Sequence, residues 1–249
     1  TIEKIKKLVS ASNKDALKII SFLYSSIIDA GIHEAPSIKV AEAAKVTENI
    51  QRDVNIALIN EMHQLYSSIG INTNDVIEAA STKWNFMKLS PGLVGGHCIS
   101  IDPYYLMHKS KMTGYTPHLM SLARTLNDNM AEWVIERFLF FVSENNIELQ
   151  SVSTTLFGYS FKDNCGDVRN TKVYDLVLSL KDLGINFSIW DPLIDKDTQD
   201  KLRNLDIKVH IDEPKHSEVQ LAFVCTYHDQ IINFLKTYNG FVFDYKNII

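Results

Sequence analysis

The clearest concentration of reactive side chains is segment 95–103, with the sequence GGHCISIDP. Two glycines ahead of Cys98 allow the backbone to turn tightly and to approach a ligand closely. Pro103 suits the first turn of a helix, so Cys98 is expected just before a helix N-terminus, where the dipole favours a thiolate. With Asp102 nearby, this pattern predicts a nucleophile for covalent catalysis. The alternative is a small buried cysteine with Asp102 as a helix cap.

Two other uses of this segment are disfavoured by the motifs. His97, Cys98 and Asp102 are possible metal ligands, but the chain contains no CxxC, HxxxH or HExxH spacing. No metal is therefore expected. A Cys–His protease is disfavoured because no histidine further along the chain has a recognisable partner signature.

A second candidate is the pair Lys45 and Asn49, which lie one helical turn apart. A cation and an amide on one helix face could stabilise a developing oxyanion. A solvated helix face is the alternative interpretation. However, the polar stripe continues through Asp53 to Asn60 in an otherwise apolar helix. The stripe is therefore predicted to form a wall of the site.

Segment 161–171, with the sequence FKDNCGDVRNT, is the third candidate. It joins a predicted strand to a predicted helix, and ligands bind at the carboxyl ends of strands in such sheets. Lys162 and Arg169 flank the helix N-terminus, which suits an anion such as a phosphate. The segment has no GxGxxG, so it is not a standard dinucleotide fingerprint. Asp191 stands where a ribose-binding acid would lie, but it is interpreted as a turn residue beside Pro192.

The elements that must position these residues fall into two blocks. Helical apolar spacing or capping predicts helices over 13–29, 37–68, 74–82, 103–112 and 117–145. Segment 88–98 is a glycine-bearing loop, and no strand is predicted between 37 and 145, so this central block is expected to be all-α. A short strand over 4–9 precedes it.

After Asn146 the pattern changes to alternating strands and helices. Strands are predicted over 152–158, 185–190, 207–211, 219–225 and 241–244, and helices over 172–183 and 228–238. This alternation indicates an α/β, Rossmann-like domain with a parallel, doubly wound sheet.

Composition excludes several functional classes. The chain has 249 residues, 45% of them hydrophobic, which is enough for one or two globular cores. A net charge of −5 argues against nucleic acid, and the apolar runs are too short to span a membrane. Three widely spaced cysteines and no recognisable signal peptide favour a reducing, cytoplasmic location over a disulfide framework.

Three segments, taken in order, resemble the UDP-glucose/GDP-mannose dehydrogenase family. They are 41–57 (AEAAKVTENIQRDVNIA), 91–106 (PGLVGGHCISIDPYYL) and 161–172 (FKDNCGDVRNTK). Segment 83–86 (KWNF) is similar to the subgroup that oxidises UDP-N-acetylhexosamines for bacterial surface polysaccharides. The chain departs from the family at Ile50, where Thr is usual, and at Ser100, where Pro or Gly is common. The likeness is weak from about residue 213 onward.

The resemblance implies a domain order and an assembly. Residues 1–36 resemble the end of an N-terminal NAD-binding domain, 37–148 a central helical dimerisation and catalytic domain, and 149–249 a UDP-sugar-binding domain. A homodimer built on helices 37–69 and 117–145 is expected. Because the family's GxGxxG is absent, the chain is expected to be a fragment that does not turn over NAD alone.

The resemblance also implies the chemistry, a two-step NAD-dependent oxidation of the sugar C6 hydroxyl to a carboxylate. Cys98 would form a thiohemiacetal and then a thioester, with Lys45 and Asn49 stabilising the oxyanion and Asp102 activating water. The substrate-binding residues would be Lys45, Asn49, Leu89, Gly92, Val94, Gly95, Phe161, Lys162 and Lys246. The cofactor-binding residues would be Cys98 and Arg169.

A non-enzymatic product is the competing hypothesis. It would be a truncated chain that dimerises and binds a nucleotide sugar without turnover. A pure scaffold is disfavoured, because it has no need of a reactive cysteine after Gly-Gly-His. Which UDP-sugar is used is left open by the sequence.

Overall fold

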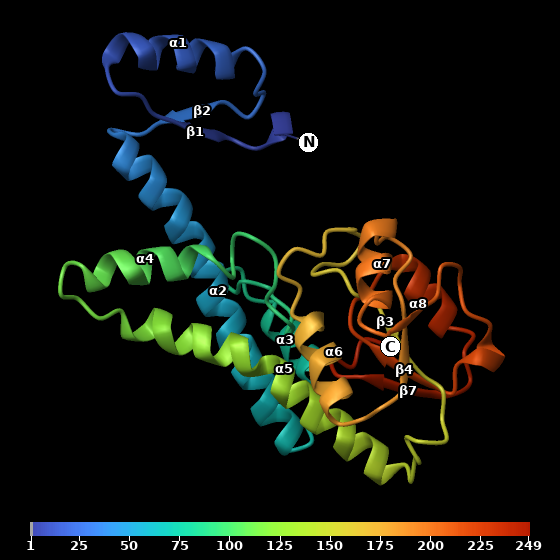
Figure 1. Cartoon of the computed structure of the whole chain (residues 1–249). Coiled ribbons are helices and arrows are strands. Elements are labelled where there is room, and N and C mark those ends of the chain that lie inside the picture. Colours follow the sequence, from blue (N-terminus) through green and yellow to red (C-terminus); the bar gives the residue numbers. More distant parts are fainter. Residues whose placement is uncertain (1) are drawn as a thin grey trace. The chain divides into compact units, whose positions relative to one another are not determined.

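The computed structural model describes residues 2–249 and divides into two compact units (Figure 1). The first unit ends at Gln51 and the second comprises Arg52–Ile249. The boundary lies within the long helix α2 (Ile38–Ser68), which the sequence predicts over 37–68.

The first unit contains a parallel β-α-β arrangement. After a 3₁₀ turn (Ile2–Lys4), β1 (Lys7–Val9) pairs with β2 (Ile32–Glu34), and α1 (Lys14–Ser25) connects the two strands. The α1 N-terminus is capped by the side chain of Asn13. The predicted first strand and helix are confirmed with shorter bounds. β2 was missed because three residues are too few to show a period.

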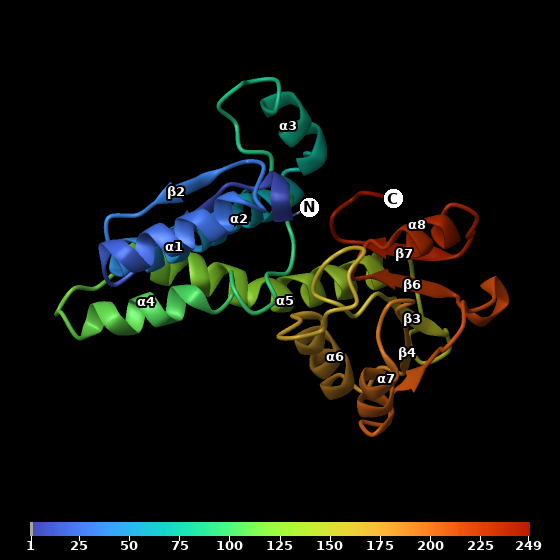
Figure 2. The ribbon, with the colours of Figure 1, turned by 90° about the horizontal axis from the view of Figure 1, so that it is seen from above.

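The first part of the second unit is helical. Besides its share of α2, it contains α3 (Thr73–Ala80), α4 (Asp102–Lys111) and α5 (His118–Glu144), all close to their predicted bounds. The described residues between α2 and β3 include no strand. α4 and α5 lie side by side (Figures 1 and 2).

A five-stranded parallel sheet follows, with the strand order β5-β4-β3-β6-β7. Its strands are β3 (Thr154–Phe157), β4 (Phe187–Trp190), β5 (Lys208–Val209), β6 (Leu221–Val224) and β7 (Phe241–Asp244). Its helices are α6 (Val173–Asp182), α7 (Lys196–Arg203) and α8 (Asp229–Leu235), with a 3₁₀ turn at His216–Glu218. Figure 2 shows β7, β6, β3 and β4 in this order. The predicted helical block followed by a parallel sheet with helices is confirmed.

Alternate residues of the central strand β3 belong to two separate hydrophobic clusters. Leu156 packs in a cluster with residues of α5 and α6, whereas Phe157 packs with residues of α8. In the first cluster, Phe138 of α5 stacks on Phe223 of β6 with ring centroids 4.8 Å apart. Burial on both faces explains why every residue of the neighbouring strand β6 is apolar. It also fixes the sheet against α5.

Helix α7 was missed by the sequence analysis. Its sequence KDTQDKLR is strongly polar, and only Thr198 and Leu202 are buried. The helix begins where the side chain of Asp195 accepts a hydrogen bond from the Thr198 amide at 2.8 Å. None of the helices described over residues 2–249 is both long and apolar enough to cross a bilayer.

Candidate active site

Cys98 lies in the turn that leads into α4, as predicted. Its carbonyl oxygen accepts hydrogen bonds from the backbone amides of Ile101 at 3.1 Å and Asp102 at 2.8 Å. Asp102 is the first residue of α4, and a proline follows within its first turn. The Cys98 side chain is half-buried. The nucleophile candidate is therefore held at a defined position and stays accessible.

Gly95 and Gly96 permit a close approach, but the approach is to another loop of the protein. A Cβ atom at Gly95 would lie 2.8 Å from the Asn170 carbonyl oxygen and 2.9 Å from Cβ of Phe161. Gly96 has a φ of +86°, and a Cβ there would meet the Phe161 ring at 3.0 Å. Both glycines therefore pack the cysteine loop onto segment 161–171, and the assignment of Gly95 to substrate binding stays a prediction.

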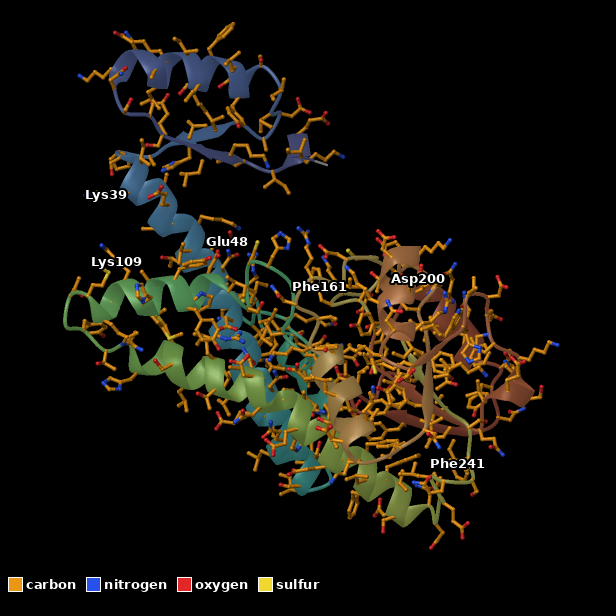
Figure 3. All side chains as sticks on the ribbon, viewed as in Figure 1. Lys39, Glu48, Lys109, Phe161, Asp200 and Phe241 are labelled. Atoms are coloured by element: carbon orange, nitrogen blue, oxygen red, sulfur yellow. The ribbon has the colours of Figure 1, made fainter. Side chains whose placement is uncertain are left out.

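A cavity of about 220 Å³ lies beside this contact. Six of the expected substrate-binding residues line it, namely Gly92, Val94, Gly95, Phe161, Lys162 and Lys246. Phe161 is labelled in Figure 3. Ile56 and Ile99 also line it and were not predicted, since apolar residues on helix and loop carry no motif. Leu89 is half-buried and is not among the lining residues.

Lys246 brings a positive charge to this cavity. Its ammonium lies 4.6 Å from the ring centroid of Tyr227 and 5.8 Å from that of Tyr245, and over residues 2–249 it has no ion-pair partner within 4 Å. Burial lowers the pKa of Lys246, while Asp163 and Asp244 oppose that shift. A Cβ at Gly92 would lie 3.2 Å from the ammonium nitrogen. A poorly compensated cation at a cavity wall suits a phosphate-bearing ligand.

Asp191 fixes the backbone that leads from β3 into segment 161–171. One carboxylate oxygen accepts the backbone amides of Tyr159 at 2.7 Å and Ser160 at 2.9 Å, and the other accepts Leu193 N–H at 2.8 Å. Burial alone would raise the pKa of Asp191, but the hydrogen bonds from His228 and these amides lower it to about 2. The interpretation of Asp191 as a turn residue is confirmed, because both of its carboxylate oxygens accept backbone N–H groups of the protein, including that of Leu193 two residues further on.

Ser160, His228 and Asp191 have the composition of a catalytic triad but not its geometry. The His228 Nδ1 atom accepts the Asn164 amide at 2.8 Å, so the ring proton is on Nε2. Nε2 faces both the Ser160 hydroxyl at 2.9 Å and the Asp191 carboxylate at 3.2 Å. A triad needs serine and aspartate on different ring nitrogens. The group therefore anchors the loop.

Arg169, the expected cofactor contact, has an exposed side chain that pairs with Asp167 at 2.5 Å. The hydrogen bonds from Arg169 lower the pKa of Asp167 to about 2. Both residues lie on segment 161–171, shortly before α6 begins. The assignment of Arg169 to a cofactor stays a prediction.

Lys45 and Asn49 belong to the first unit and contact each other as their spacing predicts. The Lys45 ammonium donates to the Asn49 amide oxygen at 3.3 Å and to the Glu48 carboxylate at 2.8 Å. Glu48 is labelled in Figure 3. Asn49 is fully buried and Lys45 is exposed, so the pair is not a uniformly solvated face.

The continuation of the polar stripe differs from the expectation of one continuous site wall. Asp53 points into the α2–α5 interface, where it accepts Arg124 at 2.6 Å and Asn127 at 2.8 Å. Asn60 instead contacts the cavity loop at Gly92. Arg124 and Asn127 were missed, although two strongly polar residues three positions apart in a long apolar helix are a visible signal of buried pairing.

The turns that follow β1 and β3 have no glycine-rich phosphate cradle. The turn between β1 and α1, residues 10–13 (SASN), contains no glycine for a phosphate cradle. Gly158 follows β3 with a φ of +88°, but a Cβ there would lie 2.4 Å from Thr226, so protein occupies that space. No three His, Cys, Asp or Glu side chains converge on a metal position within residues 2–249.

Comparison with known proteins points to one family across both blocks. The model of the UDP-glucose/GDP-mannose dehydrogenase family, central domain, matches residues 39–129, and that of the family's UDP binding domain matches 155–249. The chain is 42% identical to Protein CapL of Staphylococcus aureus over 100% of this chain and 59% of the relative. It is 42% identical to a UDP-N-acetyl-D-glucosamine 6-dehydrogenase of Pseudomonas aeruginosa over 93% and 54%.

The fold is also similar to solved structures. A UDP-glucose dehydrogenase from the archaeon Pyrobaculum islandicum aligns with a TM-score of 0.84 at 18% identity, over 99% of this chain and 56% of that one. The chain therefore spans just over half the length of the relatives that it matches.

Proposed function

The chain belongs to the UDP-glucose/GDP-mannose dehydrogenase family, and on this basis we propose that it carries the nucleotide-sugar site and the nucleophile of a UDP-sugar 6-dehydrogenase. A UDP-N-acetylhexosamine is the favoured substrate, because the 42% identical relative from Pseudomonas aeruginosa is named for one. The oxidised sugar would serve surface polysaccharide synthesis. NAD is the proposed oxidant.

The observation that carries this proposal is the cavity beside the Cys98 loop. Residues 90–95 form one wall, and the other lining residues include Lys162 and Lys246. Two cations suit a pyrophosphate, and the apolar lining suits a base or sugar ring. We therefore assign the cavity to the UDP-sugar, with Leu89 contributing at its edge.

The proposed covalent chemistry centres on Cys98. Its thiolate adds to the C6 aldehyde of the sugar, forming a carbon–sulfur bond, and the carbonyl oxygen takes a proton to give a thiohemiacetal. NAD, when bound, supplies the two oxidations that precede and follow this adduct. Water then attacks the resulting thioester, and the thiolate leaves as the carboxylate forms. In this proposal Asp102, the first residue of α4, orients that water.

Three further roles complete the proposal. Lys45 and Asn49 stabilise the oxyanion that develops at C6, since each offers a donor and they already contact each other. Arg169 meets the cofactor. The turns after β1 and β3 have no glycine-rich cradle for its phosphates.

We propose the domain limits 1–36, 37–148 and 149–249. The parallel β1–α1–β2 arrangement supports the first as part of a dinucleotide-binding domain. The two family-model matches support the central and UDP-binding domains. The two-sided burial of the last sheet supports its assignment as Rossmann-like and doubly wound.

A homodimer is the expected assembly. Within the second unit, α2 exposes Leu58 and Leu65, and α5 exposes Leu119 and Leu122, the last at 60%. Exposed leucines repeated along two helices favour a protein interface. Light scattering of the chain at micromolar concentration should therefore give about twice 28.3 kDa. A monomer mass throughout that range would contradict the dimer.

Replacing Lys246 with methionine tests the nucleotide assignment. Loss of one charge-assisted contact with a pyrophosphate should weaken UDP binding by about 10- to 100-fold. The fold should persist, because methionine keeps the stem and removes a poorly compensated cation. Calorimetry with UDP measures the effect, and Lys201→Met on α7 is the matched control. Equal UDP affinity in the Lys246→Met variant and the unmodified chain would refute the assignment.

A further inference from the structure

The loop that forms the cavity wall has an unusual hydrogen-bond partner. Residues 86–95 contain no helix or strand, so their backbone groups need partners elsewhere. The side chain of Asn60 provides two of them. Its amide oxygen accepts the Gly92 N–H at 2.8 Å, and its amide nitrogen donates to the Gly92 carbonyl at 3.0 Å. Asn60 thus pairs with the Gly92 peptide as a neighbouring strand would.

The orientation of this amide is fixed by Asn127 of α5. Asn127 donates through its amide nitrogen to the backbone carbonyl of Asp53 at 3.0 Å and to the Asp53 carboxylate at 2.8 Å. Its oxygen must therefore face Asn60, whose amide nitrogen donates to it at 2.9 Å. Asn60 and Asn127 are both fully buried. Only one arrangement of donors and acceptors satisfies all these contacts.

The network continues from Asp53 to the start of α6. Arg124 bridges the carboxylates of Asp53 at 2.6 Å and Asp128 at 2.5 Å, and the Lys172 ammonium lies 3.3 Å from Asp128. Lys172 directly follows segment 161–171, which forms the other side of the cavity. An unbroken series of polar contacts therefore connects the two segments that line the cavity. Each member is buried or half-buried, so the cost of misplacing one is high.

Gly92 also lies against Lys246. A Cβ on Gly92 would lie 3.0 Å from Cε of Lys246 and 3.2 Å from its ammonium nitrogen. A shift of the Gly92 peptide would therefore change both the loop and the space in front of the cation. The placement of this peptide decides the shape of the cavity.

We propose that Asn60 is a positioning residue for nucleotide-sugar binding: it holds the Gly92 peptide at the place where the loop and Lys246 together receive the substrate. This inference rests on the proposed function of the cavity. Asn60 touches neither Cys98 nor the cavity directly, so it sets the affinity for the nucleotide sugar and leaves the reactivity of the thiol unchanged.

Asn60→Asp is the sharpest test, because the side chain keeps its size and an acceptor for the Gly92 amide but loses its donor. The Gly92 carbonyl and the Asn127 oxygen then both face a carboxylate. Hydrogen exchange of the ligand-free chain should show peptide 88–98 exchanging at least ~10-fold faster, with the sheet unchanged. Calorimetry should show at least ~10-fold weaker UDP binding. In turnover assays KM should rise while kcat stays the same.

Gln64→Glu is the matched control. It makes the same amide-to-acid change one turn further along α2, where Gln64 contacts Met130 and not the loop. Its loop exchange and UDP affinity should equal those of the unmodified chain. Asn60→Ser, a neutral variant, is measured in parallel so that a folded protein is available if the buried charge prevents folding.

The possible outcomes separate this inference from the function beneath it. If the unmodified chain does not bind UDP but the Asn60 variants still show faster loop exchange, the proposed function is rejected. The role of Asn60 in holding the loop is then retained. Unchanged loop exchange and unchanged affinity in both Asn60 variants would overturn the positioning role. Equally faster exchange in the loop and the sheet would also overturn it, because Asn60 would then support the whole unit.

Discussion

Cys98→Ser should lower uronic acid formation by roughly 10³-fold or more, because a serine hydroxyl is far less ionised than a thiol and its adduct leaves less readily. Turnover is measured with a dinucleotide-binding domain present, since residues 2–249 contain no cradle for NAD. UDP affinity should stay within about twofold, because Cys98 is outside the set of residues that line the cavity.

Cys165→Ser is the control for this substitution. Cys165 is a half-buried cysteine on segment 161–171, so it reports the general effect of removing a thiol near the site. Its turnover should stay within about threefold of the unmodified protein. Near-normal uronic acid formation by the Cys98→Ser protein would reject the covalent scheme.

Asp191→Ala should destabilise the second unit by about 3–5 kcal/mol. The substitution leaves the amides of Tyr159, Ser160 and Leu193 without their acceptor, and removes the charge opposite His228. Urea unfolding followed by circular dichroism measures the change. Asp195→Ala, at the exposed cap of α7, should cost much less. Equal losses in the two variants would contradict the anchoring role of Asp191.

The depressed pKa of Asp191 gives this anchor a pH signature. Its value is about 2 in the folded protein against an ordinary value of 3.8. The unfolded chain therefore binds the proton first, and the stabilisation is present above about pH 4 and is lost as the pH falls towards 2. The stabilisation that this pKa difference provides above pH 4 amounts to about 2 kcal/mol. In Asp191→Asn the free energy of unfolding should fall less steeply over this window.

The long elements could be predicted because each carries its own pattern. α2 and α5 show helical periodicity, β6 is an apolar run, and β3 combines two β-branched threonines with two apolar residues. β2 and α7 were missed for opposite reasons. One is too short to show a period, and the other is too polar to show an apolar face.

The positions of the candidate residues along the fold were predictable, but their contacts were not. Segments 91–98 and 161–171 each carry a motif, and the fold brings them together at one cavity. The packing of Gly95 and Gly96 on Phe161 was not predicted, since glycine in a sequence does not reveal what approaches it. The roles of Asp53 and Asn60 depend on α5, which is more than sixty residues away. Such pairings leave no local pattern.

Protection of Cys98 from alkylation by the proposed substrate tests whether Cys98 lies beside the nucleotide-sugar site. The chain is treated with iodoacetamide with and without UDP-N-acetylglucosamine, and the labelling rates of Cys98 and Cys165 are followed by peptide mass spectrometry. With ligand at about ten times its Kd, roughly 90% of the sites are filled, so Cys98 labelling should slow about tenfold. Cys165 labelling should not change. Unchanged labelling of Cys98 while calorimetry shows the ligand bound would contradict the account.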